Sequence, residues 1–155
     1  MTRMGIVTST TVFGMLLSLS LGAGDRGTAD EAKALLQKAV EHYKQVGRKQ
    51  ALEDFTGKKS PWVDRDLYVA CGDSKSIIVA NGAFPNLVGS SSNLAKDVNG
   101  KPLGDSMWQA AAKGGIQTVE YSWYNPVTGK MERKVAFVEK VDADIRCSVG
   151  SYKAQ

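Results

Sequence analysis

Residues 119–138 of this 155-residue chain read VEYSWYNPVTGKMERKVAFV, and this stretch decides the fold. Two long runs of β-type residues, 116–124 and 131–138, stand on either side of a turn-forming segment at 125–129. Asn, Pro and Gly in that segment are typical of a tight connection between strands. The stretch therefore predicts two long antiparallel strands.

The alternation along these strands predicts which side chains share a face. Val119, Tyr121 and Trp123 are two residues apart, so they point to the same side of the sheet. Simple pairing about the turn sets Lys134 opposite Glu120, as a cross-strand ion pair on the outer face. A bulge in either strand would reverse that facing, so the position of Lys134 stays open at this stage.

The remaining elements extend outward from this pair of strands. Residues 67–71 and 76–80 are short β-type runs joined by a turn, and residues 145–152 form a last strand. A capping box at residues 28–31 begins a long helix whose apolar positions recur every three or four residues until Gly47. A shorter helix follows it, and another is expected at residues 105–113.

These elements together predict one domain of the α+β class. A long N-terminal helix would pack on a five-stranded antiparallel sheet of the PAS-like kind, with helices to one side. A chain of this length has room for one domain with a continuous core.

The N-terminus has the layout of a secretory signal peptide over residues 1–24. One basic residue, an apolar segment at residues 12–21 and small residues at 22–24 follow one another in the expected order. A membrane anchor is the alternative, but the apolar stretch is shorter than the roughly 20 residues that a spanning helix needs. Residues 25–155 would then form the mature domain, periplasmic or secreted, with no membrane span.

Charge and motifs exclude several classes of function. The net charge of +4 is spread along the chain, with acids between the basic residues, so no basic stripe for nucleic acid is present. The sole histidine, His42, stands in a helical pattern without a nucleophile or metal partner. No phosphate loop, zinc motif or nucleophile elbow occurs. We expect neither an enzyme nor a bound cofactor or metal.

The chain resembles the single Cache domain family over residues 28–153. Residues 119–138 are similar to the C-terminal signature of that family, with an aromatic strand, a Pro turn and a Lys three residues before an aromatic. Residues 85–89 (PNLVG), 99–104 (NGKPLG) and 147–153 (CSVGSYK) are similar to three further family segments. Asn81, Ser90 and Phe137 depart from the residues that many members carry.

The resemblance implies a sensor of a small molecule, and it suggests which residues contact the ligand. Most Cache domains are extracellular parts of membrane receptors and sensor kinases, so such a receptor or kinase is the implied partner. A cation among aromatic side chains would hold a short organic acid. The candidate ligand-binding residues are Tyr68, Trp108, Tyr121, Trp123, Lys134 and Phe137. Core packing is the alternative for the aromatic residues, and a protein that keeps the fold without a pocket, for structural or interaction purposes, is the alternative function.

Cys71 and Cys147 are expected to form a disulfide. An even number of cysteines fits an oxidising compartment. The PAS-like strand order that the resemblance implies makes the first and last strands neighbours, which places the two cysteines opposite each other. Two unpaired buried thiols are the alternative.

Overall fold

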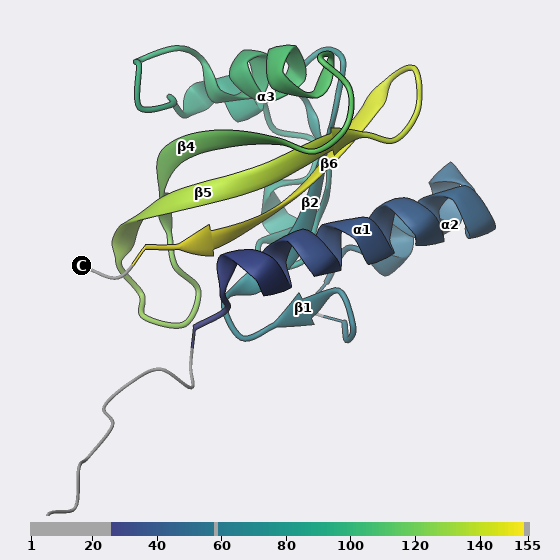
Figure 1. The fold of residues 1–155 in the computed structure, drawn as a ribbon, viewed down its shortest axis with the longest axis horizontal. Helices are drawn as coiled ribbons and strands as arrows, with labels where there is room; N and C mark the ends of the chain where they lie inside the picture. The colour runs from purple at the N-terminus through teal and green to yellow at the C-terminus, as the bar shows by residue number, and fades with distance from the viewer. Residues whose placement is uncertain (1–25, 58, 154–155) are drawn as a thin grey trace, which may run out of the picture.

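A long helix packed on an antiparallel sheet forms most of the computed structural model, which describes residues 26–57 and 59–153 (Figure 1). The predicted signal peptide, residues 1–24, lies outside the described residues. The predicted α+β fold of the PAS-like kind is confirmed. Two helices, α1 (Ala29–Val46) and α2 (Arg48–Asp54), precede the first strand.

The capping box predicted for α1 is present. The Thr28 hydroxyl oxygen accepts the backbone N–H of Glu31 at 3.2 Å, and the Glu31 carboxylate accepts the backbone N–H of Thr28 at 2.8 Å. The apolar face that follows is buried as the spacing predicted, and it packs against the sheet. Its buried members are Ala32, Leu35, Leu36, Ala39, Val40 and Tyr43.

The sheet has six strands rather than the five expected. The additional strand is a two-residue segment that pairs with the start of the next strand. The strand order is β1-β2-β6-β5-β4, and β3 also pairs with β2. The strands are β1 (Val63–Asp64), β2 (Leu67–Asp73), β3 (Ile78–Asn81), β4 (Gln117–Tyr124), β5 (Met131–Lys140) and β6 (Ile145–Tyr152).

The first long strand and the last strand are neighbours, as the sequence predicted. In the register of β2 and β6, Cys71 stands directly opposite Cys147. Their α-carbons are 4.1 Å apart and their sulfurs are bonded. The predicted disulfide is therefore confirmed, and it links the two strands at the centre of the sheet.

The expectation of helices to one side of the sheet is wrong, because different helices cover its two faces (Figure 1). The helix α1 packs on the face that carries Val69, Cys147 and Val149. The helix α3 (Leu103–Ala111) packs on the opposite face, on side chains of β4 and β5 that include Val119 and Val138. Two short 3₁₀ helices, η1 (Pro85–Leu87) and η2 (Ser92–Leu94), interrupt the loop that leads to α3.

The hairpin of β4 and β5 is offset by one residue from the simple pairing. Lys134 stands opposite Tyr121, not Glu120, and the loop between the paired ends Tyr124 and Met131 has six residues. Because side chains alternate between faces, one residue of offset moves Lys134 from the outer face to the inner one. Arg133 takes the outer position instead, and its guanidinium lies 3.2 Å from the Glu120 carboxylate. The outer-face ion pair considered for Lys134 is therefore wrong.

A buried polar network fixes the tip of this hairpin. The side-chain amide of Asn125 donates to the carboxylates of Asp66 and Glu132, at 3.2 and 3.0 Å. Arg26 binds the same Glu132 carboxylate at 2.7 and 3.0 Å, and this ion pair lowers the pKa of Glu132 to about 2. The start of the described chain, the β1–β2 turn and the hairpin are thus tied together.

Candidate functional site

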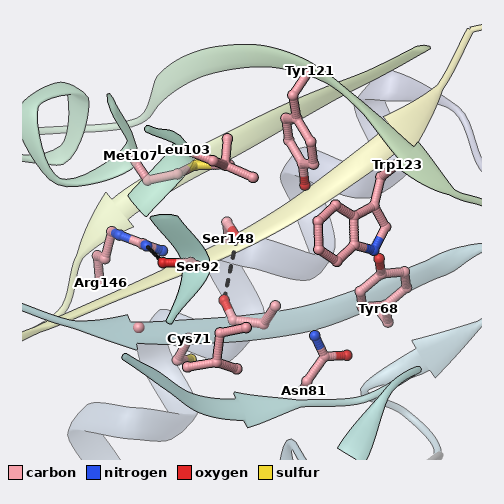
Figure 2. Close-up of a pocket in the computed structure, with 13 residues that line it drawn as sticks. Tyr68, Cys71, Asn81, Ser92, Leu103, Met107, Tyr121, Trp123, Arg146 and Ser148 are labelled. Atoms are coloured by element: carbon pink, nitrogen blue, oxygen red, sulfur yellow. Dashed lines mark hydrogen bonds between the residues drawn. The ribbon is translucent and has the colours of Figure 1, made fainter. Parts of the chain in front are cut away.

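A small cavity lies between the sheet and the segment that carries η2 and α3 (Figure 2). Its volume is about 50 Å³, and since a water molecule needs roughly 10–15 Å³, it has room for a few waters or a small ligand. Most of its wall is apolar or aromatic. The lining residues are Tyr68, Ala70, Cys71, Gly72, Ile78, Asn81, Ser92, Leu103, Met107, Tyr121, Trp123, Arg146 and Ser148.

Arg146 is the one charged side chain among these lining residues. Only 4% of the residue is exposed, and its Nε has no hydrogen-bond partner. Its single side-chain hydrogen bond is a long one, 3.5 Å from Nη2 to the hydroxyl oxygen of Ser92. No carboxylate within the described ranges forms an ion pair with it.

The burial of Arg146 has an electrostatic consequence. Desolvation lowers the pKa of its guanidinium to about 10, because burial disfavours the charged form. Asp73 and Tyr121 oppose this shift only in part. A buried cation without a partner is costly, and an anion in the cavity would supply the missing partner.

Glycine at position 72 makes room for this guanidinium. A Cβ on Gly72 would lie 2.9 Å from Nη2 of Arg146, closer than real Cβ atoms approach other heavy atoms. The absence of a side chain on β2 thus lets the arginine of β6 fold across its neighbour.

Polar contacts hold the lid of the cavity, the segment from η2 to the start of α3, against the turn between β2 and β3. The Ser92 hydroxyl donates to the backbone oxygen of Ser76 at 2.8 Å, and the Ser76 hydroxyl donates to the Asp105 carboxylate at 3.0 Å. The side-chain amide of Asn93 donates to that carboxylate at 2.8 Å. Ser92, the part of the lid that bonds Arg146, is therefore held in place by the β2–β3 turn.

Gly104→Ala is expected to loosen this lid and weaken ligand binding. A Cβ at Gly104 would lie 2.5 Å from Cβ of Ser76 and closer still to Oγ of Ser92, so α3 must move outward. Overpacking of this kind costs about 1–3 kcal/mol of stability. Thermal unfolding and ligand titration measure the two effects. Gly100→Ala controls for a general loss of stability, because a Cβ there meets open space while the backbone is strained. An unchanged affinity in Gly104→Ala would contradict the role of the lid.

Three of the predicted aromatic residues line the cavity. Tyr121 and Trp123 project from β4 on the same face, with their rings 5.9 Å apart in an edge-to-face arrangement. Tyr68 comes from β2 and is almost fully buried. Figure 2 shows these three side chains together at the end of the cavity away from Arg146. Their contact with a ligand stays a prediction.

The structure does not bring Trp108 or Phe137 to this cavity. Phe137 alternates with Ala136 and Val138 along β5, so its ring points to the other face and packs with the α1 core. Trp108 lies on α3 away from the cavity, with the Lys140 ammonium 5.2 Å above its ring. Both side chains fit the core-packing and surface alternatives better than ligand contact.

Lys134 lies behind the cavity wall. Its Nζ is 3.8 Å from the ring centre of Tyr68, which lines the cavity, and 4.4 Å from that of Tyr152. The residue is 2% exposed, and its one hydrogen bond joins Nζ to the Tyr152 hydroxyl at 3.4 Å. Burial lowers the pKa of Lys134 to about 7, although the charge of Asp66 opposes this shift.

Sequence reasoning missed Arg146, and a signal for it was present. It is the only charged residue in a final strand whose eight positions are all buried. A lone cation next to the half-cystine Cys147, in an otherwise apolar and small-residue strand, indicates a buried charge with a specific task. The contributions of Ser92 and Leu103 had no comparable signal, since both come from a loop and a short helix placed by tertiary packing.

The geometry of this site suits the binding of a small molecule. In the part of the chain that the structure covers, no cluster of three or more His, Cys, Asp or Glu side chains could hold a metal. The same residues include no helix long and apolar enough to cross a membrane. A small cavity with one buried cation and an aromatic wall defines a module that binds a small molecule.

The family follows from a comparison with protein-family models. The model described as "Single Cache domain 2" matches residues 24–153. The chain therefore belongs to the single Cache domain 2 family, whose members are sensory ligand-binding modules. A search of curated proteins gives no significant match.

Solved structures of chemotaxis sensor domains share the fold. A methyl-accepting chemotaxis protein from Vibrio parahaemolyticus is 24% identical, with a TM-score of 0.65 over 79% of this chain and 86% of that one. A Cache chemosensory domain described in terms of carboxylic acid recognition is 17% identical, with a TM-score of 0.64 over 81% and 92%. A periplasmic sensor domain of a chemotaxis protein is 20% identical, with a TM-score of 0.58 over 81% and 90%.

Proposed function

We propose that this domain is a periplasmic or secreted sensor that binds a short carboxylate at Arg146 and signals through a membrane receptor or sensor kinase. The observation that carries this proposal is the buried guanidinium, open to the cavity and without an acidic partner. A carboxylate matches the planar fork of an arginine and can accept two of its N–H groups.

The surroundings of Arg146 support an anionic ligand. No acidic side chain is among the residues that line the cavity. Ser92 and Ser148 add hydroxyl groups beside the guanidinium, although each already bonds a backbone oxygen, Ser76 and Ala70 respectively. A carboxylate bound here would satisfy the free Nε and offset the desolvation of the cation.

The fold and the comparisons give the biological context. One structural relative is described as recognising a carboxylic acid, and another as a periplasmic sensor domain. Those descriptions apply to the relatives, and they make the same compartment and ligand class a reasonable proposal for this chain.

Arg146→Met is expected to weaken carboxylate binding strongly while it stabilises the empty domain. The methionine fills similar space without a buried charge, so the melting temperature of the empty variant should equal or exceed that of the wild type. Affinity for a carboxylate should fall at least about 30-fold, because loss of a buried charged partner costs about 2–5 kcal/mol. A thermal-shift panel of organic acids, followed by calorimetry on the best compound, measures both quantities.

Arg133→Met is the matched control for this experiment. Its side chain is 54% exposed and pairs with Glu120 on the outer face. We expect the control to bind carboxylates as the wild type does. If no acid raises the melting temperature of the wild type, or if Arg146→Met binds equally well, the proposal fails and a Cache fold that serves interaction alone becomes the better explanation.

A further inference from the structure

The end of the cavity opposite Arg146 presents hydrogen-bond donors. Asn81 lies on β3, and Trp123 lies on β4 (Figure 2). Asn81 is 4% exposed, and both side chains are among those that line the cavity. This second polar end has no part in holding a carboxylate on the arginine.

The orientation of the Asn81 amide is fixed by the backbone. Its Oδ1 accepts the N–H groups of Ala83 and Phe84, at 3.1 and 2.8 Å. The side-chain NH₂ must therefore be the group that faces away from this turn. Figure 2 shows that nitrogen turned up toward the ring of Trp123. Across residues 26–57 and 59–153, no acceptor forms a hydrogen bond with it.

The side chains around the Asn81 nitrogen also favour a ligand atom that accepts hydrogen bonds. The indole N–H of Trp123 can only donate, and it lies against the hydroxyl of Tyr68, which also meets the Tyr152 hydroxyl at 3.4 Å. The hydroxyl groups of Tyr68 and Tyr121 can do both, and burial raises the pKa of both, so they stay neutral. The Asn81 NH₂ without an acceptor, beside the adaptable Tyr121 hydroxyl, favours a ligand oxygen that accepts hydrogen bonds.

A neutral carbonyl suits these donors better than a second carboxylate. The nearest cation, Lys134, lies behind the ring of Tyr68 and does not line the cavity. A second buried carboxylate would lack a direct counter-ion, and the burial of an unpaired charge is expensive. A carbonyl oxygen needs only the donors that are present.

We propose that the ligand is a short oxo acid, whose carboxylate binds Arg146 and whose carbonyl oxygen accepts from Asn81. This inference rests on the proposed function, because it takes the carboxylate at Arg146 as given. Asn81 is then the residue that selects among carboxylates.

The register of the sheet sets how far apart Asn81 and Arg146 lie. It therefore also sets the spacing of the two ligand groups that they would bind. Asn81 pairs with Ala70 of β2, whereas Arg146 pairs with Gly72 from the other side of that strand. Two residues along a strand span roughly 6.5 Å, and β3 and β6 lie roughly 9.5 Å apart across β2, so the carbonyl should stand some carbons away from the carboxylate even though the two side chains converge on the cavity. Levulinate, with two methylene groups between its carboxylate and carbonyl carbons, fits this spacing better than pyruvate.

The test compares each oxo acid with a partner in which a methyl group replaces the oxygen. The pairs are levulinate with isocaproate, and pyruvate with isobutyrate, titrated by calorimetry into the wild type, Asn81→Asp and Trp123→Phe. We expect the wild type to bind levulinate at least about tenfold more tightly than isocaproate, because an apolar group leaves the donors unpaired.

Asn81→Asp is the decisive variant. Aspartate keeps an oxygen for the backbone N–H groups of Ala83 and Phe84, so the turn is preserved, but it replaces the NH₂ donor with an acceptor. Its added charge weakens both members of a pair alike, so the ratio of affinities within the pair is the readout. That ratio should fall to about one or below, with a smaller fall in Trp123→Phe.

Each other outcome overturns the inference in a distinguishable way. Equal binding of both pair members to the wild type, or an unchanged ratio in Asn81→Asp, removes the oxo acid and leaves the carboxylate site intact. If glutarate binds more tightly than levulinate, the Asn81 end of the cavity holds a second carboxylate rather than a carbonyl group. If no acid of the panel binds the wild type, the proposed function fails together with the inference.

Discussion

Reduction of the Cys71–Cys147 disulfide should lower the melting temperature by more than about 10 °C. The bond joins residues 76 positions apart in the sequence. On the chain-entropy model, closure of a loop of that length stabilises the fold by roughly 4–5 kcal/mol. Each kcal/mol shifts the melting temperature of a domain of this size by about 3–5 °C. The loss is also a large part of the stability of a typical domain.

The measurement is thermal unfolding with and without a reductant, with alkylation and mass analysis of the thiols. The double variant Cys71→Ala/Cys147→Ala is the control, since it should melt low in both conditions and show no response to the reductant. An equal melting temperature for the oxidised and the fully alkylated wild type would contradict the expected contribution of the bond.

Lys134→Met should remove a pH dependence of stability that the wild type shows above neutral pH. Burial lowers the pKa of Lys134 to about 7 in the folded protein, whereas an unfolded lysine keeps the usual 10.5. Between those two values the unfolded chain binds more protons than the folded one. Stability therefore rises as the pH rises from about 7 toward 10, by a few kcal/mol in total.

The cost of the buried ammonium is fully present below about pH 7, so Lys134→Met should be more stable than the wild type there. The charged and titratable groups that face this amine are Tyr68 on β2, Tyr152 on β6, Tyr121 on β4 and Asp66 in the β1–β2 turn. Burial raises the pKa of all three tyrosines, so they stay neutral in the folded state over this range.

Denaturant unfolding at several pH values between 6 and about 9.5 measures the effect. The exposed Lys113→Met, at the end of α3, is the control and should follow the wild type. Subtraction of the Lys134→Met curve from that of the wild type cancels the contribution of the other titratable groups. A difference that does not change with pH would show that the amine titrates as an exposed lysine.

Most of the fold was predictable because it depends on local periodicity and on chain order. The spacing of Leu35, Leu36 and Val40 identified one face of α1, and the turn chemistry at residues 125–129 identified the hairpin. The disulfide was predictable because the strand order implied by the family resemblance makes β2 and β6 neighbours. The two-residue strand β1 has no periodic signal, so it was missed.

The candidate site was less predictable, since its members come from distant parts of the chain. Tyr68, Tyr121 and Trp123 were found because alternation puts the two β4 residues on one face and the fold puts β2 nearby. Phe137 was misplaced because the simple pairing sets it on the face of Tyr121, whereas the one-residue offset of the hairpin turns its ring to the face that α1 covers. Arg146 was missed because its signal, a lone cation in the final strand, is no recognised motif and was given no weight.

The sequence by itself determined the helices and the longer strands, since hydrophobic period and turn residues act over short ranges of chain. The strand order came from the resemblance of its motifs to the Cache family. Tertiary structure alone decided the facing of Lys134, because the sixth residue of the hairpin loop shifts the register by one and reverses every side chain beyond it. It also decided that Arg146 lies without an ionic partner at one end of the cavity, and that Asn81 lies at the other end. Both results depend on which side chains of separate strands meet, and no local pattern contains that information.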